Sequence, residues 1–126
     1  MRKLVGAAVV VGVLVTSAAA CGGGSGNSYK EPAGPAIATL KIQAGNSWFK
    51  PKQLESPAGI VRIRLKNSEP GVHTLVIEDV PDFKLQVSGK GATSESKVEL
   101  KARKYTFYCS IPGHREAWME GTLTAG

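Results

Sequence analysis

The segment YCSIPGHREAWM, residues 108–119, holds three side chains that can bind a soft or borderline metal ion. Cys109, His114 and Met119 follow one another at intervals of five residues, and the only other histidine of the chain is His73. Pro112 and Gly113 allow the chain to turn sharply and to bring His114 back beside the sulfur of Cys109. One loop thus offers a thiolate, an imidazole and a thioether, and the second histidine can complete the set.

The donor types favour copper over other metals. Zinc prefers four strong N, S or O ligands, and a thioether is a weak one. Iron–sulfur clusters need more thiolates, and the C-x-x-C-H motif for haem attachment is missing from the sequence. Two histidines and one cysteine with a weak axial methionine are the ligand set of blue-copper electron-transfer sites.

Taken singly, each of these residues has a commoner structural role. A lone His73 would more often be a hydrogen-bonded structural histidine, and a lone Cys109 or Met119 would more often pack in a core. Their joint occurrence favours one metal site, because an unpaired thiol in an oxidising compartment must be buried, paired with another molecule or bound. Trp48 and Trp118 are expected to be packing residues, with Trp118 the better candidate for an exposed docking contact.

The beginning of the chain predicts export. A short basic head, an apolar run too short to cross a membrane and Ala18-Ala19-Ala20 form a signal peptide over residues 1–20. Small residues before Cys21 and a Gly/Ser-rich stretch after it resemble the lipobox of bacterial lipoproteins, in which the cysteine is diacylated. We expect a lipidated Cys21 and a flexible tether over 21–35, then a domain over 36–126. An ordinary secretory signal is the alternative.

Size and charge indicate one domain without a nucleic-acid partner. Removal of residues 1–20 leaves 106 residues, with 14 lysines and arginines against 10 acidic residues and a net charge of +4. The basic residues are scattered and are not interleaved with aromatic residues as on a nucleic-acid surface. We expect a monomer whose basic residues form a solvated face, with a mild preference for acidic partners or anionic lipid.

Short apolar runs between turn residues predict an all-β domain. In IVRIRLK, residues 60–66, the apolar and basic residues alternate, which is typical of a half-buried strand. No window has a helical period, and residues 115–120 would form barely one turn. We expect a Greek-key β-sandwich or barrel of seven or eight strands, with residues 88–96 as the longest polar loop. The other expected strands cover residues 37–44, 72–77, 83–87, 96–100, 104–109 and 121–125.

Three segments together resemble the cupredoxins, the plastocyanin and azurin group of blue copper proteins. These segments are NSEPGVHTLVIE, YTFYCSIPGHREAWMEGTL and FKPKQLESPAG. The specific part is Cys-x₄-His-x₄-Met with one histidine upstream. The resemblance implies a cupredoxin-like sandwich that holds one type 1 copper ion.

The resemblance also assigns roles by position. His73, Cys109 and His114 would be the equatorial ligands, and Met119 the axial ligand. The hydroxyls of Thr74 and Ser110 would tie the two ligand loops together, and Asn67 would act as a turn residue or second-shell partner. The sequence departs from the common pattern in two ways: Trp118 stands where many relatives have glycine, and the Cys–His spacing is longer than in plastocyanin.

Three functions are compatible with such a site. The first is a membrane-tethered carrier of single electrons between extracytoplasmic redox proteins, with His114 as the exit. The second is copper delivery or storage, against which stands the absence of a Met/His-rich tract from the sequence. The third is an enzyme, which we do not expect: an oxidase of this fold needs more copper centres, and a Cys–His hydrolase needs a base and an oxyanion hole.

Overall fold

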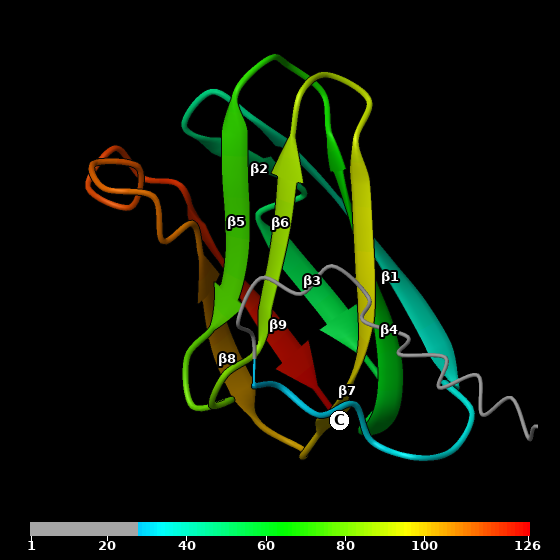
Figure 1. Cartoon of the computed structure of the whole chain (residues 1–126). Helices are drawn as coiled ribbons and strands as arrows, with labels where there is room; N and C mark the ends of the chain where they lie inside the picture. The colour runs from blue at the N-terminus through cyan, green and yellow to red at the C-terminus, as the bar shows by residue number, and fades with distance from the viewer. Residues whose placement is uncertain (1–27) are drawn as a thin grey trace, which may run out of the picture.

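The computed structural model describes residues 28–126, which form two β-sheets packed face to face (Figure 1). The predicted signal peptide, Cys21 and the first part of the predicted tether lie outside the described residues. Among residues 28–126 we find no helix with the length and apolar character needed to cross a membrane.

Nine strands make up the two sheets. The four-stranded sheet has the order β2-β1-β4-β7 and the five-stranded sheet the order β3-β9-β8-β5-β6. Both sheets are mixed, because β1 pairs with β4 and β3 with β9 in parallel, while the other pairs are antiparallel. The strands are β1 (Ala38–Gly45), β2 (Trp48–Lys50), β3 (Gln53–Ser56), β4 (Gly59–Asn67), β5 (Val72–Ile77), β6 (Lys84–Ser88), β7 (Thr93–Leu100), β8 (Lys104–Tyr108) and β9 (Glu120–Ala125).

This architecture confirms the predicted all-β sandwich, with two strands more than the sequence had located. The additional strands β2 and β3 are three and four residues long. Runs this short are not long enough to display an alternating pattern, so pairing with β1 and β9 defines them instead.

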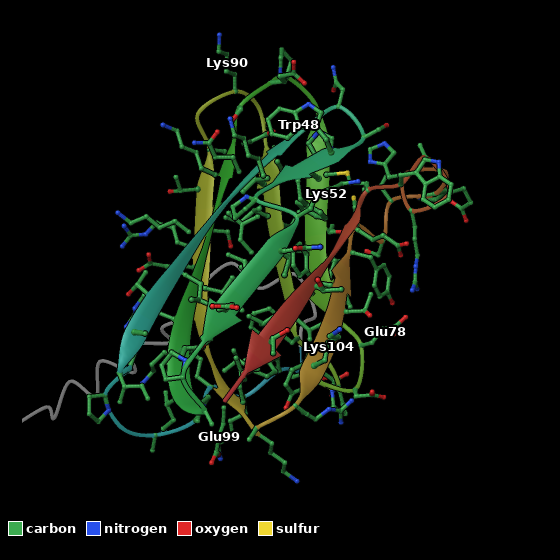
Figure 2. All side chains as sticks on the ribbon, turned by 180° about the vertical axis from the view of Figure 1, so that it is seen from behind. Trp48, Lys52, Glu78, Lys90, Glu99 and Lys104 are labelled. Atoms are coloured by element: carbon green, nitrogen blue, oxygen red, sulfur yellow. The ribbon has the colours of Figure 1, made fainter. Side chains whose placement is uncertain are left out.

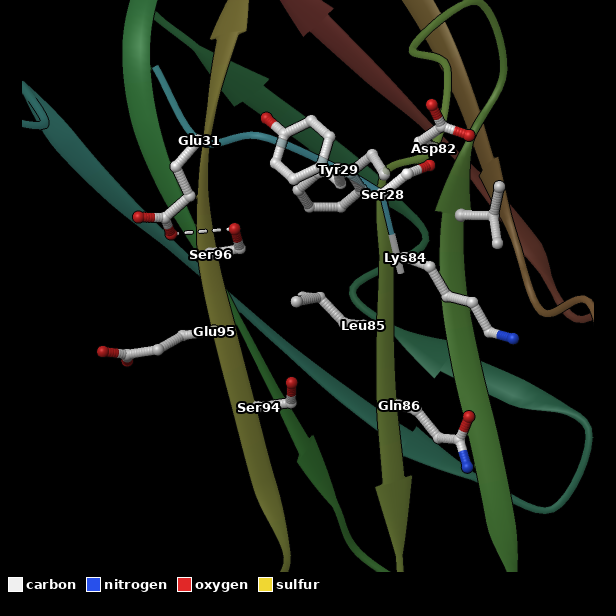
Figure 3. A pocket seen from close by; sticks show the side chains of 12 residues that line it. Ser28, Tyr29, Glu31, Asp82, Lys84, Leu85, Gln86, Ser94, Glu95 and Ser96 are labelled. Atoms are coloured by element: carbon white, nitrogen blue, oxygen red, sulfur yellow. Dashed lines mark hydrogen bonds between the residues drawn. The ribbon is translucent and has the colours of Figure 1, made fainter. Parts of the chain in front are cut away.

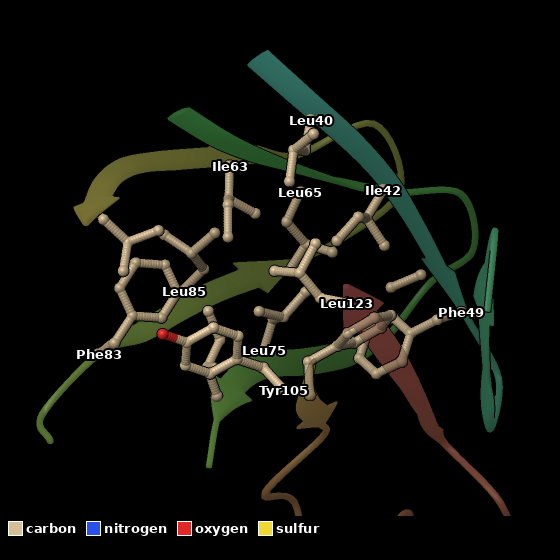
Figure 4. Close-up of a cluster of buried hydrophobic side chains, with 14 of the residues drawn as sticks. Leu40, Ile42, Phe49, Ile63, Leu65, Leu75, Phe83, Leu85, Tyr105 and Leu123 are labelled. Carbon is tan, nitrogen blue, oxygen red and sulfur yellow. The ribbon is translucent and has the colours of Figure 1, made fainter. Parts of the chain in front are cut away.

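Alternation along the strands builds the core between the sheets (Figure 4). In β4, Val61, Ile63 and Leu65 are buried, while the basic residues between them face outward. Burial of one such aliphatic side chain contributes about 1.5–3 kcal/mol. The largest fully buried apolar side chains include Phe83, Phe107, Ile63, Leu65, Leu75, Ile77, Leu100, Met119 and Leu123.

The predicted long loop over residues 88–96 is wrong. β6 ends at Ser88 and β7 begins at Thr93, so only four residues connect them. Backbone hydrogen bonds from Gly89 N to Gly71 O (3.0 Å) and from Gly91 N to Asn67 O (2.8 Å) hold this connection. The segment looked like a loop because β7 is an edge strand with polar residues on its solvent face.

The end of the predicted tether belongs to the sandwich rather than to a free linker. Tyr29 packs edge-on against Phe83, with ring centroids 5.1 Å apart, and its hydroxyl donates to Lys97 O at 2.7 Å. The Glu31 carboxylate accepts bonds from Ser96 Oγ (2.8 Å) and Lys97 N (2.9 Å) at the edge of β7 (Figure 3). These bonds lower the pKa of Glu31.

Gly121 provides a test of the packing between β9 and its neighbours. A Cβ atom at this position would lie 2.3 Å from Phe107 Cζ and 2.4 Å from Lys52 O. We predict that G121A lowers the free energy of unfolding in urea by about 1–3 kcal/mol through overpacking. The control T124V, at an exposed position of the same strand, should stay within about 0.5 kcal/mol of the parent. Equal urea midpoints for G121A and T124V would contradict this packing.

Candidate metal centre

The start of β5 and the end of β8 bring three predicted ligands to one place. His73 is the second residue of β5, Cys109 directly follows β8, and His114 lies in the loop before β9. One ligand atom from each of the three lies within 4.8 Å of the others. Cys109 Sγ and His114 Nδ1 are 3.4 Å apart, and the two imidazole centroids are 5.2 Å apart. These distances suit a single ion between the three side chains.

The burial of the site fits a metal better than a set of structural residues. Cys109 is fully buried, and His73 is 2% exposed. Both ring nitrogens of His73 lack a hydrogen-bond partner among the described residues, although buried polar atoms are normally paired. Burial, reinforced by the neighbouring His114, lowers the pKa of His73 and favours the neutral imidazole that binds metals. An ion would satisfy the unpaired nitrogen that faces it.

Thr74 links the β5 side of the site to the β8 side. Its backbone N–H donates to Cys109 Sγ at 3.4 Å. Its hydroxyl oxygen accepts a bond from Ser110 N at 2.7 Å and lies 2.7 Å from Ser110 Oγ. Thr74 is therefore bonded both to Cys109 and to Ser110.

Asn67 holds the turn that leads into His73. It is fully buried, and its side-chain nitrogen donates to Gly71 O (2.9 Å) and Gly89 O (3.0 Å). These bonds join the turn between β4 and β5 to the connection after β6. Asn67 is therefore a positioning residue for the turn, because its side-chain nitrogen bonds to two backbone carbonyls.

The backbone of Met119 lies between the other loop ligands. Cys109 N donates to Met119 O at 3.1 Å, and Met119 N donates to His114 O at 3.0 Å. The side chain is fully buried. A buried thioether carried beside Cys109 and His114 is in the right neighbourhood for a fourth, weak ligand.

The segment between the loop ligands consists of turns, so the single helical turn considered for residues 115–120 does not form. Trp118 has a φ of 71°, in the left-handed region that glycine favours. Its side chain is 73% exposed while the next residue is fully buried. The left-handed backbone thus turns the indole outward and Met119 inward, and the indole projects into solvent instead of covering the site.

Arg115 was missed by the sequence analysis. Its guanidinium bonds to Glu78, after β5, and to Glu120, at the start of β9, the latter at 3.2 Å. It also lies over the ring of Tyr108, 4.0 Å from the centroid, and the acidic partners raise its pKa. Arg115 therefore joins the ligand loop to three strand ends. The only sequence signal is its place after His114, since no local pattern identifies Glu78 as a partner.

Comparison with known proteins identifies the family. The sequence matches the cupredoxin-like domain over residues 7–125. The chain belongs to the cupredoxin-like family. In this cupredoxin, His73, Cys109 and His114 form a candidate type 1 copper site. No curated protein matches the chain.

Solved structures with the same fold include several auracyanins. Auracyanin B is 20% identical with a TM-score of 0.62, over 76% of this chain and 94% of its own. An auracyanin from Roseiflexus castenholzii is 22% identical with a TM-score of 0.62, over 73% and 99%. Auracyanin A from Chloroflexus aurantiacus, described as a "blue" copper protein, is 21% identical with a TM-score of 0.55, over 70% and 98%. At these identities the likeness establishes the fold of this cupredoxin.

The Thr74 hydroxyl gives a test of the link between the two halves of the site. T74V removes the acceptor of the Ser110 N–H, so we predict a loss of about 1–3 kcal/mol in the free energy of unfolding of the metal-free protein. T74S keeps the hydroxyl and should lose clearly less. S110A, which leaves the backbone donor in place, is the matched control. Equal losses in T74V and T74S would contradict this role.

The Arg115 contacts predict a loop that opens more readily when they are removed. In R115M, we expect amide hydrogen exchange at Trp118 and Met119 to accelerate about fivefold, which corresponds to about 1 kcal/mol for a surface ion-pair network. The control is R103M, because Arg103 pairs with Asp79 and lies over Tyr105 in a similar way but away from the site. Equal exchange in R115M and the parent would show that the loop does not depend on Arg115.

Proposed function

We propose that this protein is a type 1 copper protein that carries single electrons between redox proteins outside the cytoplasm. One observation carries the proposal: a buried thiol and two imidazoles present ligand atoms within 4.8 Å of one another. His₂Cys donor sets of this kind belong to blue-copper electron-transfer sites. Copper supplies the one-electron chemistry, and the chain supplies its position and surroundings.

A rigid ligand set suits repeated electron transfer. His73 is anchored in β5, and Cys109 is held by the Thr74 N–H and by its own backbone bond to Met119. Ligands that keep their places in both oxidation states require little rearrangement. We propose Met119 as the axial ligand and Thr74, Ser110 and Asn67 as the residues that position the equatorial ligands.

The two histidines have different roles in this proposal. His73 is buried, whereas His114 is half-buried and lies in a loop that also carries exposed Pro112 and Trp118. His114 is therefore the proposed route by which electrons enter and leave. Trp118 would be an apolar contact for the redox partner beside it.

We further propose that residues 1–20 are removed on export and that an acylated Cys21 anchors the protein to the outer side of the membrane. The support is the sequence around Cys21 and the attachment of residues 29–34 to β7. Two or more acyl chains would hold the protein stably at the membrane.

Copper delivery is the weaker candidate. Transfer of an ion to another protein needs ligands that a recipient can reach, whereas Cys109 and Met119 are fully buried. Storage or delivery would also benefit from additional sulfur or imidazole donors, and residues 28–126 contain only the donors of this one site.

Loading with Cu(II) tests the proposal. We expect an intense blue absorption, reversible one-electron reduction and loss of the colour in C109S. Colourless binding of Cu(I) that exchanges readily would support delivery and contradict the carrier function. Chemical reduction and reoxidation of the same sample distinguish the two outcomes.

The axial role of Met119 yields a separate prediction. In M119L, we expect the blue colour to remain and the reduction potential to rise, because a thioether that donates electron density to the oxidised ion is lost. L123M, a buried swap of similar volume in β9, is the control and should leave the potential unchanged. An M119L potential equal to that of the parent would rule out an axial thioether.

A further inference from the structure

The outer face of the four-stranded sheet carries the net charge of the mature chain. Outward positions of β1, β2, β4 and β7 hold six basic residues and two acidic residues. The rest of the chain after residue 20 has eight basic and eight acidic residues. We call this surface the basic face; its charged residues are Lys41, Lys50, Arg62, Arg64, Lys66, Lys97, Glu95 and Glu99.

Strand register gathers residues that are far apart in the sequence. Lys41 of β1 lies beside Arg64 of β4, and Arg64 lies beside Glu95 of β7. Glu95 bonds to Arg64 at 2.6 Å and to Arg62 at 3.4 Å. One acid is thus shared by two arginines, which leaves most of the positive charge of the face uncompensated.

None of the four lysines of the basic face makes an ion pair among residues 28–126; Lys97 donates to Gly34 O, and the other three are Lys41, Lys50 and Lys66. All three are exposed. A lysine ammonium is a hydrated point charge on a flexible stem, in contrast to the fixed fork of arginine. Such groups suit a surface of mobile anionic groups better than one fixed carboxylate.

The composition of the face argues for lipid rather than protein. Protein interfaces bury an apolar, aromatic-rich centre and are depleted in lysine. The exposed large apolar side chains of the described chain are Ile37, Val72 and Trp118, and none of them occupies an outward position of these four strands. Charge without an apolar centre fits the headgroup layer of an anionic bilayer, where each basic residue strengthens binding about fivefold.

The chain also reaches this face from its N-terminal side. Lys97 Nζ donates to Gly34 O at 2.7 Å, and Glu31 bonds to the edge of β7. Six residues lie between Cys21 and Ser28, so the seven steps from one to the other span at most about 25 Å. The loop that follows β8 projects on the side of the sandwich away from β1 and β4 (Figure 1), so a bilayer on the basic face leaves the metal site accessible.

We propose that the basic face binds anionic phospholipid headgroups and lays the four-stranded sheet against the membrane. The electron-transfer loop then faces away from the bilayer and toward its redox partners. This orientation needs neither the bound metal nor an acyl chain, so it stands independently of the function proposed above.

Lysine footprinting on membranes tests the orientation. The full chain is mixed with vesicles of phosphatidylglycerol and phosphatidylcholine, or of phosphatidylcholine alone, and its lysines are acetylated and quantified by mass spectrometry. We expect Lys41, Lys50 and Lys66 to react at least fivefold more slowly on the anionic vesicles only, with the protection lost in high salt. Lys101 and Lys104, which lie after the end of β7 and at the start of β8, are internal controls; Figure 2 labels Lys104 on the five-stranded sheet.

Charge reversal separates this proposal from simple tethering. In K41E/K66E, the remaining reporter Lys50 should lose its protection on anionic vesicles. In the control K101E/K104E, the reporters Lys41, Lys50 and Lys66 should stay protected. Equal protection of both sets of lysines, or none on anionic vesicles, would overturn the proposal. Protection that appears only when an acidic protein is added would assign the face to a protein partner and would equally overturn it.

Discussion

The hydrogen bond from the Thr74 backbone to the Cys109 sulfur is the interaction around which the site is arranged. It joins the strand that carries the first histidine to the strand that ends in the cysteine. The Thr74 hydroxyl then fixes the next residue after Cys109. Because both strands belong to the five-stranded sheet, the position of the thiol is set by the sandwich itself rather than by the mobile end of a loop.

The loop after Cys109 adds the second imidazole of the site, His114. Its turns place His114 3.4 Å from the sulfur and return the chain to β9 through a left-handed residue at Trp118. A glycine would adopt this conformation without strain, whereas the Cβ atom of Trp118 makes the same backbone conformation cost about 1–2 kcal/mol. The contacts of Arg115 with Glu78 and Glu120 hold the loop against the strand ends. The result is one deeply buried and one half-buried imidazole, and this difference is the basis for proposing His114 as the electron route.

The sequence predicted those features that depend on local patterns. Cys109, His114 and Met119 are close in the chain, and their donor types already indicated one metal site. The alternation in β4 likewise follows from its own residues. Partners distant in the chain were not predictable: Arg115 and Glu78 are 37 residues apart, and no local period connects them.

The same limit applies to the grouping of the basic residues. Lys41 and Arg64 appeared scattered along the chain, but parallel pairing of β1 with β4 places them side by side. The polar residues of β7 suggested a loop because an edge strand can be polar and still pair along its other side. Register, which no single segment contains, converts scattered basic residues into one face of the molecule.

We propose that His73, Cys109 and His114 all bind one ion. X-ray absorption at the copper edge of the Cu(II)-loaded protein tests this, because it reports the atoms bound to the metal. We predict one short copper–sulfur contact and two imidazole nitrogens, with one nitrogen lost in a His73 variant. A shell of nitrogen and oxygen without sulfur, or a shell unchanged by substitution of His73, would contradict it.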